Sequence, residues 1–124
     1  MIIGTGVDLA EVDRIREAIE RHGARFTERI YTPTEIAYVE RKANRYERYA
    51  ARFAAKEAGM KALGTGWNGV RWRDFEVDNL PSGLPTLRFH GAAARIAEEL
   101  GVRNVALSLT HTATQALAYV ILEG

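Results

Sequence analysis

Cysteine is absent from all 124 residues, which excludes disulfide bonds, thiolate nucleophiles and zinc sites built on thiolates. No apolar run approaches the roughly 20 residues that a membrane-spanning helix needs. The chain starts Met-Ile-Ile-Gly-Thr-Gly-Val-Asp, without the basic start and cleavage site of a signal peptide. We therefore expect a cytoplasmic protein with no membrane partner.

The composition, with 47% hydrophobic and 27% charged residues, is typical of a globular protein and excludes the disordered and fibrous classes. The length fits one domain over residues 1–124. The net charge of +1 conceals an asymmetry, because residues 14–61 contain 12 Lys and Arg against 7 Asp and Glu, whereas the remainder contains 5 against 9. A basic half indicates an anionic partner, although solvated helix faces with pairs such as Glu17–Arg21 would give the same count.

The spacing of apolar residues and the turn signals predict an α+β protein. Helices are predicted at residues 10–22, 33–42, 47–63 and 91–100, and strands at 2–8, 73–79, 85–89, 104–111 and 115–122. The helix at 47–63 is lined with alanines, which permit close packing, and Gly64 is expected to end it. Phe26, Ile30 and Tyr31 are expected to form only a short apolar patch.

Asp8 lies where the first predicted strand runs into the first helix. With Glu11 three residues later it forms an Asp-x-x-Glu box that could cap this helix. The N-terminus of a helix also favours a phosphate group beside a metal-bound carboxylate. The residues around Asp8 leave both interpretations open.

Glu57 lies inside the alanine-lined helix, where an exposed ion pair with Lys61 would be ordinary. It nevertheless falls close to the alanine-rich face, and a partly buried carboxylate needs a cation or a proton. Lys56 and Lys61 could be plain surface lysines, and Arg52 a solvated helix residue. Together with Glu57, they give one helix that offers both a metal ligand and cations for phosphate.

His111 ends the predicted strand at 104–111. A lone histidine at a strand end is most often structural or simply exposed. The hydroxyls of Ser108, Thr110 and Thr112 surround it, and hydroxyl and imidazole groups can all donate hydrogen bonds to phosphate oxygens. This segment is therefore a candidate anion site.

Four segments, in this order, resemble the acyl-carrier-protein-synthase type of 4′-phosphopantetheinyl transferase over essentially the whole chain. They are Gly6 to Leu9, Phe26 to Glu35, Arg52 to Gly66, and Ser108 to Thr112. The Lys-Glu-Ala helix followed by Gly-Thr-Gly is the most diagnostic of the four. Gly59 and Met60 depart from the family, which more often has bulkier residues there.

The resemblance implies the fold of that family, a mostly antiparallel sheet packed against the long alanine-lined helix and shorter helices. It implies transfer of the 4′-phosphopantetheine arm of coenzyme A to a serine of apo acyl carrier protein, in fatty acid biosynthesis, with release of adenosine 3′,5′-bisphosphate. The implied metal ligands, for Mg²⁺ or Mn²⁺, are Asp8 and Glu57. The implied catalytic residues are Glu57 and Lys61. The residues implied to bind coenzyme A are Arg45, Arg52, Lys61, His111 and Thr112.

The carrier proteins of this pathway are acidic, which would explain the excess of Lys and Arg in residues 14–61. Arg14 and Arg21 are seven residues apart on one helix and fall on similar faces, so they could dock an acidic partner helix. Arg16 and Arg25 are further candidates. The resemblance also implies a homotrimer with active sites at subunit interfaces.

Two alternatives stand beside this interpretation. A non-catalytic, basic-faced module could bind an acidic protein or nucleic acid, but aromatic residues are not interleaved with the basic half as nucleic-acid stacking requires. It also leaves Asp8 and Glu57 unexplained, and we expect no nucleic-acid partner. A detached domain of a larger synthase, acting on secondary-metabolite carriers, would change the partner and keep the chemistry.

Overall fold

Two antiparallel sheets and five α-helices make up the computed structural model, which describes residues 1–124. The elements are β1 (Ile2–Glu11), α1 (Val12–His22), α2 (Ala24–Ile30), α3 (Pro33–Glu40), α4 (Arg45–Leu63), the 3₁₀ turn η1 (Trp72–Asp74), β2 (Phe75–Asn79), β3 (Pro85–Phe89), α5 (Gly91–Leu100), β4 (Asn104–His111) and β5 (Gln115–Glu123). One sheet has the order β1-β5-β4, and β2 and β3 form a separate hairpin. The predicted α+β class is confirmed. None of the helices combines the length and the apolar character that crossing a membrane requires.

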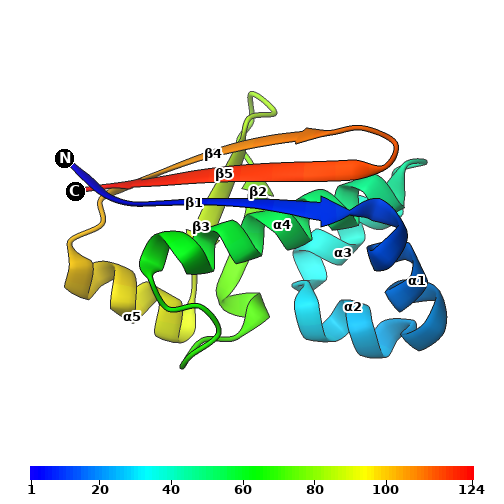
Figure 1. Cartoon of the computed structure of the whole chain (residues 1–124), viewed down its shortest axis with the longest axis horizontal. Helices are drawn as coiled ribbons and strands as arrows, with labels where there is room; N and C mark the ends of the chain where they lie inside the picture. Colours follow the sequence, from blue (N-terminus) through cyan, green and yellow to red (C-terminus); the bar gives the residue numbers. More distant parts are fainter.

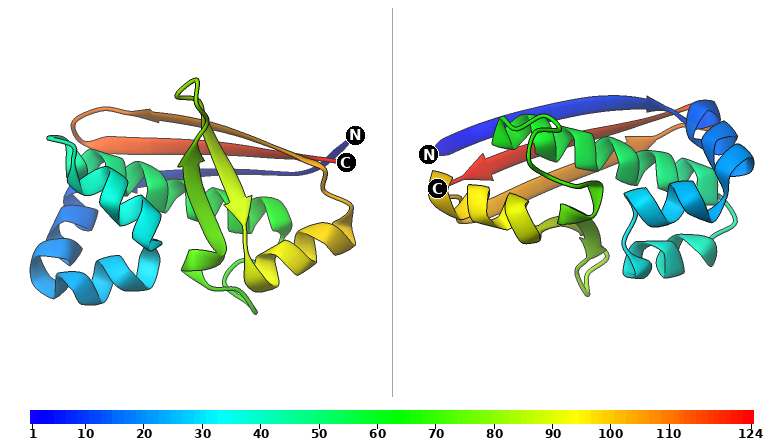
Figure 2. Two further views of the ribbon diagram at one scale, coloured as in Figure 1. Left: turned by 180° about the vertical axis from the view of Figure 1, so that it is seen from behind. Right: turned by 90° about the horizontal axis from the view of Figure 1, so that it is seen from below.

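The three-stranded sheet has one face that packs on α4 and one that faces outward. All five helices lie on the same side of the sheet, with α1 to α3 near one end of α4 and α5 near the other (Figures 1 and 2). Along β5 the buried residues alternate with exposed or half-buried ones, as expected when a single face of a strand is covered. The buried residues of β5 are Ala116, Ala118, Val120 and Leu122.

Two glycines allow β1 to lie directly against α4. A Cβ atom placed on Gly6 would lie 2.9 Å from the Ala62 nitrogen and closer still to the Ala58 carbonyl oxygen. A Cβ on Gly4 would lie 3.1 Å from the Ala62 carbonyl carbon and closer to its oxygen. These neighbours are backbone atoms of a helix and cannot turn aside, so only glycine permits this approach. Asp8 follows Gly6 by two residues and shares its face of the strand, which places its side chain at α4.

A buried ion pair ties α4 to α3 and β2. The side chain of Lys56 is fully buried, and its Nζ donates hydrogen bonds to Glu35 Oε1 at 2.7 Å and to the Phe75 carbonyl oxygen. Glu35 Oε2 in turn accepts the Val77 backbone N–H at 2.9 Å. Burial lowers the pKa of Lys56, and the charge of Glu35 opposes that shift. The interpretation of Lys56 as a surface residue is therefore wrong.

Two local predictions at the start of the chain are wrong. Asp8 does not cap α1, because β1 pairs with β5 as far as Glu11 and the helix begins only at Val12, with no side-chain cap. The segment that was expected to be a short apolar patch is helix α2. Gly23, with φ of 56°, ends α1 and begins α2 at once. A helix of 7 residues is too short to show a clear period in the sequence.

The contact between β1 and α4 predicts the effect of Gly6→Ala. Replacement of glycine by alanine in an unstrained backbone usually stabilises a protein by about 0.4–1 kcal/mol, because it restricts the unfolded chain. Here the added methyl group overlaps helix backbone, so we expect a loss of about 1–3 kcal/mol or more in the free energy of unfolding. Denaturant unfolding measures it, with Thr5→Ala on the exposed face as the control. A Gly6→Ala variant as stable as the parent protein would contradict the contact.

Candidate active site

The two carboxylates from distant segments meet across the contact between β1 and α4. Lys61 Nζ lies 3.2 Å from Asp8 Oδ1 and donates a hydrogen bond to the Val7 carbonyl oxygen at 3.0 Å. The Asp8 side chain is 15% exposed and that of Lys61 is 54% exposed. Lys61 therefore forms its ion pair with Asp8 and does not form the expected ion pair with Glu57 on the same helix.

Glu57 is half-buried and lies close enough to Asp8 for the two charges to interact. Burial raises the pKa of Glu57, the negative charge of Asp8 raises it further, and Lys61 lowers it. A shared cation would relieve this repulsion. Two carboxylates are ligands that Mg²⁺ accepts readily. No group of three or more His, Asp or Glu side chains is arranged to hold a metal, so the pair would leave most of an octahedral ion's positions to water and ligand oxygens.

Asp8 and Glu57 open onto a groove of about 480 Å³, which we call the acidic groove. Arg14 of α1 lines it, and so do apolar residues from five segments. These are Leu9, Ile15, Phe26, Phe53 and Trp67. Trp67 is 67% exposed, and its ring lies 5.6 Å from that of Trp72, which stacks on Phe53 at 4.8 Å. Sequence reasoning missed this aromatic wall, because its members come from α2, α4 and the loop after α4.

A second cavity, of about 170 Å³, lies between α4, the end of β4 and the β2–β3 hairpin. We call it the arginine cleft. Its lining includes three basic side chains and no carboxylate. The lining residues are Tyr38, Arg48, Ala51, Arg52, Asn79, Gly83, Pro85, Leu109 and His111.

Arg52 is the buried cation of the arginine cleft, with only 4% of the residue exposed. Its Nη2 donates a long hydrogen bond of 3.4 Å to Asn79 Oδ1, and its Nε has no hydrogen-bond partner in the protein. Burial lowers the pKa of Arg52, and the largest opposing influence is the charge of Glu35. A buried guanidinium that forms no ion pair is a favourable place for an anion.

Apart from Lys61, which pairs with Asp8, the other residues expected to bind coenzyme A lie in the arginine cleft or outside it. His111 lines the cleft, and its Nδ1 lies 3.1 Å from Glu47 Oε2. Thr112 Oγ1 accepts the backbone N–H groups of Thr114 and Gln115, at 3.2 and 3.0 Å, and thereby closes the β4–β5 turn. Arg45 is exposed and pairs with Glu40 at 3.1 Å. The structure thus brings Arg52 and His111 together, and neither Arg45 nor Thr112 lines the cleft.

The acidic groove and the arginine cleft share no residue. Arg52 and Glu57 are five positions apart on α4, which turns them about 140° from each other around the helix axis. Within one chain, therefore, the carboxylate pair and the predicted phosphate-binding residues face in different directions.

One basic residue of the first two helices lines the acidic groove, and others lie elsewhere on the same helices. Arg14 lines this groove, and Arg14 and Arg21 together line a shallow hollow on α1. Arg25, on α2, is exposed. None of these three forms an ion pair, whereas Arg16 pairs with Asp13 at 2.9 Å. Arg14, Arg21 and Arg25 are therefore available to an acidic partner.

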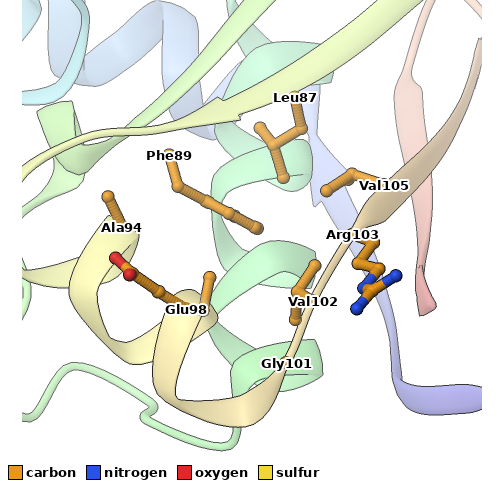
Figure 3. A pocket seen from close by; sticks show the side chains of 9 residues that line it. Leu87, Phe89, Ala94, Glu98, Gly101, Val102, Arg103 and Val105 are labelled. Atoms are coloured by element: carbon orange, nitrogen blue, oxygen red, sulfur yellow. The ribbon is translucent and has the colours of Figure 1, made fainter. Parts of the chain in front are cut away.

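Another hollow lies between β3, α5 and the start of β4 (Figure 3). Its walls are mainly apolar and include Leu87, Phe89 and Val105, with Glu98 and Arg103 as its only charged residues. No residue predicted to bind or react lies there.

Comparison with known proteins shows the family to which this chain belongs. The family model of the 4′-phosphopantetheinyl transferase superfamily matches residues 4–120, and the chain belongs to that superfamily. A holo-[acyl-carrier-protein] synthase from Solibacter usitatus is 73% identical over 125 residues, which cover 100% of both chains. The crystal structure of holo-[acyl-carrier-protein] synthase from Neisseria meningitidis is 34% identical, covers 100% of both chains and superimposes with a TM-score of 0.92. That of a synthase from Bacillus anthracis, in complex with CoA (3′,5′-ADP), is 35% identical with a TM-score of 0.81, over 98% of this chain and 96% of the other.

The charges around Glu57 predict opposite pKa changes in two variants. Asp8→Asn removes a negative neighbour and should lower the pKa of Glu57, whereas Lys61→Met removes a positive neighbour and should raise it. Carbon-13 NMR titration of glutamate-labelled, metal-free protein measures both, with the signal assigned by its loss in Glu57→Gln. Glu99→Gln, at an exposed position, should leave the titration unchanged. An unchanged pKa of Glu57 in Asp8→Asn would show that the two carboxylates do not interact.

Proposed function

We propose that this protein transfers the 4′-phosphopantetheine arm of coenzyme A to a serine hydroxyl of an apo acyl carrier protein and releases adenosine 3′,5′-bisphosphate. The observation that carries this proposal is that Asp8 of β1 and Glu57 of α4 line one groove, with the Lys61 ammonium paired to Asp8 and close enough to act on the charge of Glu57. Membership of the superfamily and the names of the similar proteins support the same reaction.

The reaction requires a group that takes a proton and a group that stabilises negative charge. The serine oxygen forms a bond to the phosphorus that carries pantetheine, while the bond from that phosphorus to the bridging oxygen of the diphosphate breaks, and the bisphosphate leaves with the electron pair. Glu57, whose pKa is raised by burial, takes the serine proton directly or through a water. Lys61 offers its ammonium group to the phosphate that is transferred.

Asp8 and Glu57 are the residues that would hold Mg²⁺, or Mn²⁺ in its place. The bound ion would neutralise charge on the diphosphate and orient the leaving group. In the structure Asp8 accepts a hydrogen bond from Lys61. If Asp8 were to bind such an ion, the Lys61 ammonium would be free to donate its hydrogen bonds to the phosphate.

The arginine cleft is proposed to hold the ribose 3′-phosphate that distinguishes coenzyme A from its dephosphorylated form. Arg52 and His111 are its expected ligands, because both line the cleft and Arg52 has an unpartnered Nε. Thr112 and Arg45 are further expected members. To reach the cleft, Thr112 would have to leave its turn and Arg45 its ion pair with Glu40.

We further propose a homotrimer in which the acidic groove of one subunit meets the arginine cleft of its neighbour. Two observations support this arrangement. The groove and the cleft face apart within one chain, and no helix covers the outer face of the sheet, where Val7, Leu9 and Tyr119 are exposed. Burial of this apolar face would stabilise an assembly of subunits.

The acidic partner is proposed to dock on Arg14, Arg21 and Arg25, next to the groove where its serine must react. An acyl carrier protein of fatty acid biosynthesis, met in the cytoplasm, is the partner that we expect. Complementary charge chiefly sets the rate and orientation of such an encounter.

The proposed reaction is tested by incubating the protein with coenzyme A, Mg²⁺ and several apo carrier proteins, followed by intact-mass measurement of the carrier. A phosphopantetheine adduct is expected on at least one carrier. Asp8→Asn and Glu57→Gln should each lower kcat by roughly 10²-fold or more, while Glu99→Gln should behave as the parent protein. Binding of carriers without any adduct would favour the non-catalytic module.

In the same assay, the double variant Arg14→Ala/Arg21→Ala should raise KM for the carrier about tenfold or more and leave KM for coenzyme A unchanged. The KM of the parent protein should increase with salt, and that of the variant should do so less steeply. Arg95→Ala, at an exposed position of α5, is the matched control. An unchanged KM for the carrier would show that Arg14 and Arg21 of α1 do not belong to the docking surface.

Shared sites predict complementation between two defective variants. Glu57→Gln and Arg52→Met should each be impaired alone, whereas mixed trimers should regain part of the activity, because some interfaces then combine an intact groove with an intact cleft. Coexpression with two affinity tags gives the mixed assemblies, and light scattering gives their mass. Mixed trimers without recovered activity would show that each chain uses its own groove and cleft. A mass other than three chains would overturn the trimer.

A further inference from the structure

The arginine cleft contains a second guanidinium that neither the sequence motifs nor the proposed ligand set includes. Arg48 precedes Arg52 by one helical turn on α4, so the two project from the same face. Both line the cleft. The Nε of Arg48 donates to Asn44 Oδ1 at 2.8 Å, which anchors the side chain. Its two terminal nitrogens form no hydrogen bond or ion pair in the protein, so the groups best suited to grip an oxyanion are free.

Tyr38 of α3 organises the positive charge of this region. Its ring centroid lies 4.7 Å from the guanidinium carbon of Arg52, 6.0 Å from that of Arg48 and 5.0 Å from Lys42 Nζ. Cations are attracted to the face of an aromatic ring, which offsets part of their mutual repulsion. The ring cannot neutralise them, and Arg48 is among the charges that lower the pKa of Arg52. The cleft therefore holds two guanidinium groups and an imidazole without a carboxylate in its lining.

We propose that Arg48 acts with Arg52 to hold the terminal phosphomonoester of the nucleotide substrate, and that Arg48 thereby selects nucleotides that carry this group. A phosphomonoester has up to two negative charges near neutral pH and three free oxygens, which two guanidinium groups can grip with several charge-assisted hydrogen bonds. This inference rests on the proposed function, because it names the ligand as part of that substrate. It assigns to Arg48 the position for which the sequence suggested Arg45.

The role of Arg48 is tested by calorimetric titration with two nucleotides that differ in one phosphate. The probes are adenosine 3′,5′-bisphosphate and adenosine 5′-monophosphate. Arg48→Met should weaken binding of the bisphosphate about tenfold or more and leave binding of the monophosphate unchanged. Arg48→Lys should recover part of the loss, because it restores the charge. Arg95→Met is the control for removal of an exposed arginine, and thermal unfolding of each variant checks the fold.

Three outcomes overturn the inference. The first is that Arg48→Met keeps the preference of the parent protein for the bisphosphate. The second is that Arg45→Met loses more of this preference than Arg48→Met, and the third is that the parent protein binds both nucleotides equally.

The carrier-modification assay separates this inference from the proposed function. A parent protein that transfers phosphopantetheine, combined with an Arg48→Met variant that still prefers coenzyme A to dephospho-coenzyme A, overturns only the role of Arg48. A parent protein that modifies no carrier overturns the proposed function, and the nucleotide titration still reports on the cleft.

Discussion

The direct contact between β1 and α4 is the constraint on which the rest of this structure depends. It exists because Gly4 and Gly6 present no side chain to the helix backbone at Ala58 and Ala62. Gly59 has a related role on the opposite side of α4, since a Cβ there would lie 2.9 Å from both Phe75 and Leu87. The helix is thus held between the large sheet and the hairpin at distances that ordinary residues would prevent. The same closeness brings Asp8 within reach of Lys61 and Glu57.

Two consecutive residues of α4 have different roles, because Lys56 stabilises the core and Glu57 belongs to the candidate active site. Lys56 points into the core and is fixed by Glu35 and the carbonyl group of Phe75, whereas Glu57 points toward β1. An ion pair without access to water is costly to form and strongly destabilising to break. Its partners are specific in position, so the pair fixes the rotation of α4 about its own axis. That rotation determines which way Glu57 faces.

The sequence predicted features that depend on local signals or on distinctive motifs. Gly64 ends α4 as expected, and α5 spans the predicted residues 91–100. Asp8 and Glu57 were paired through the resemblance, and the structure brings them together. The burial of Lys56 was not predicted, because a lysine next to a glutamate in the sequence is equally compatible with an exposed helix face. Arg48 was missed, although its spacing of four from Arg52 was a usable signal.

Trp67 and Trp72 are the chain's only two tryptophans, and their rings lie 5.6 Å apart beside the acidic groove. One indole is open to water, and the other is wedged between it and Phe53. The tryptophan fluorescence of the protein therefore originates at the mouth of the groove. A molecule that enters the groove changes the polarity around Trp67, whereas a ligand confined to the arginine cleft does not. Tryptophan fluorescence can therefore report the binding of a molecule in the acidic groove without any added label.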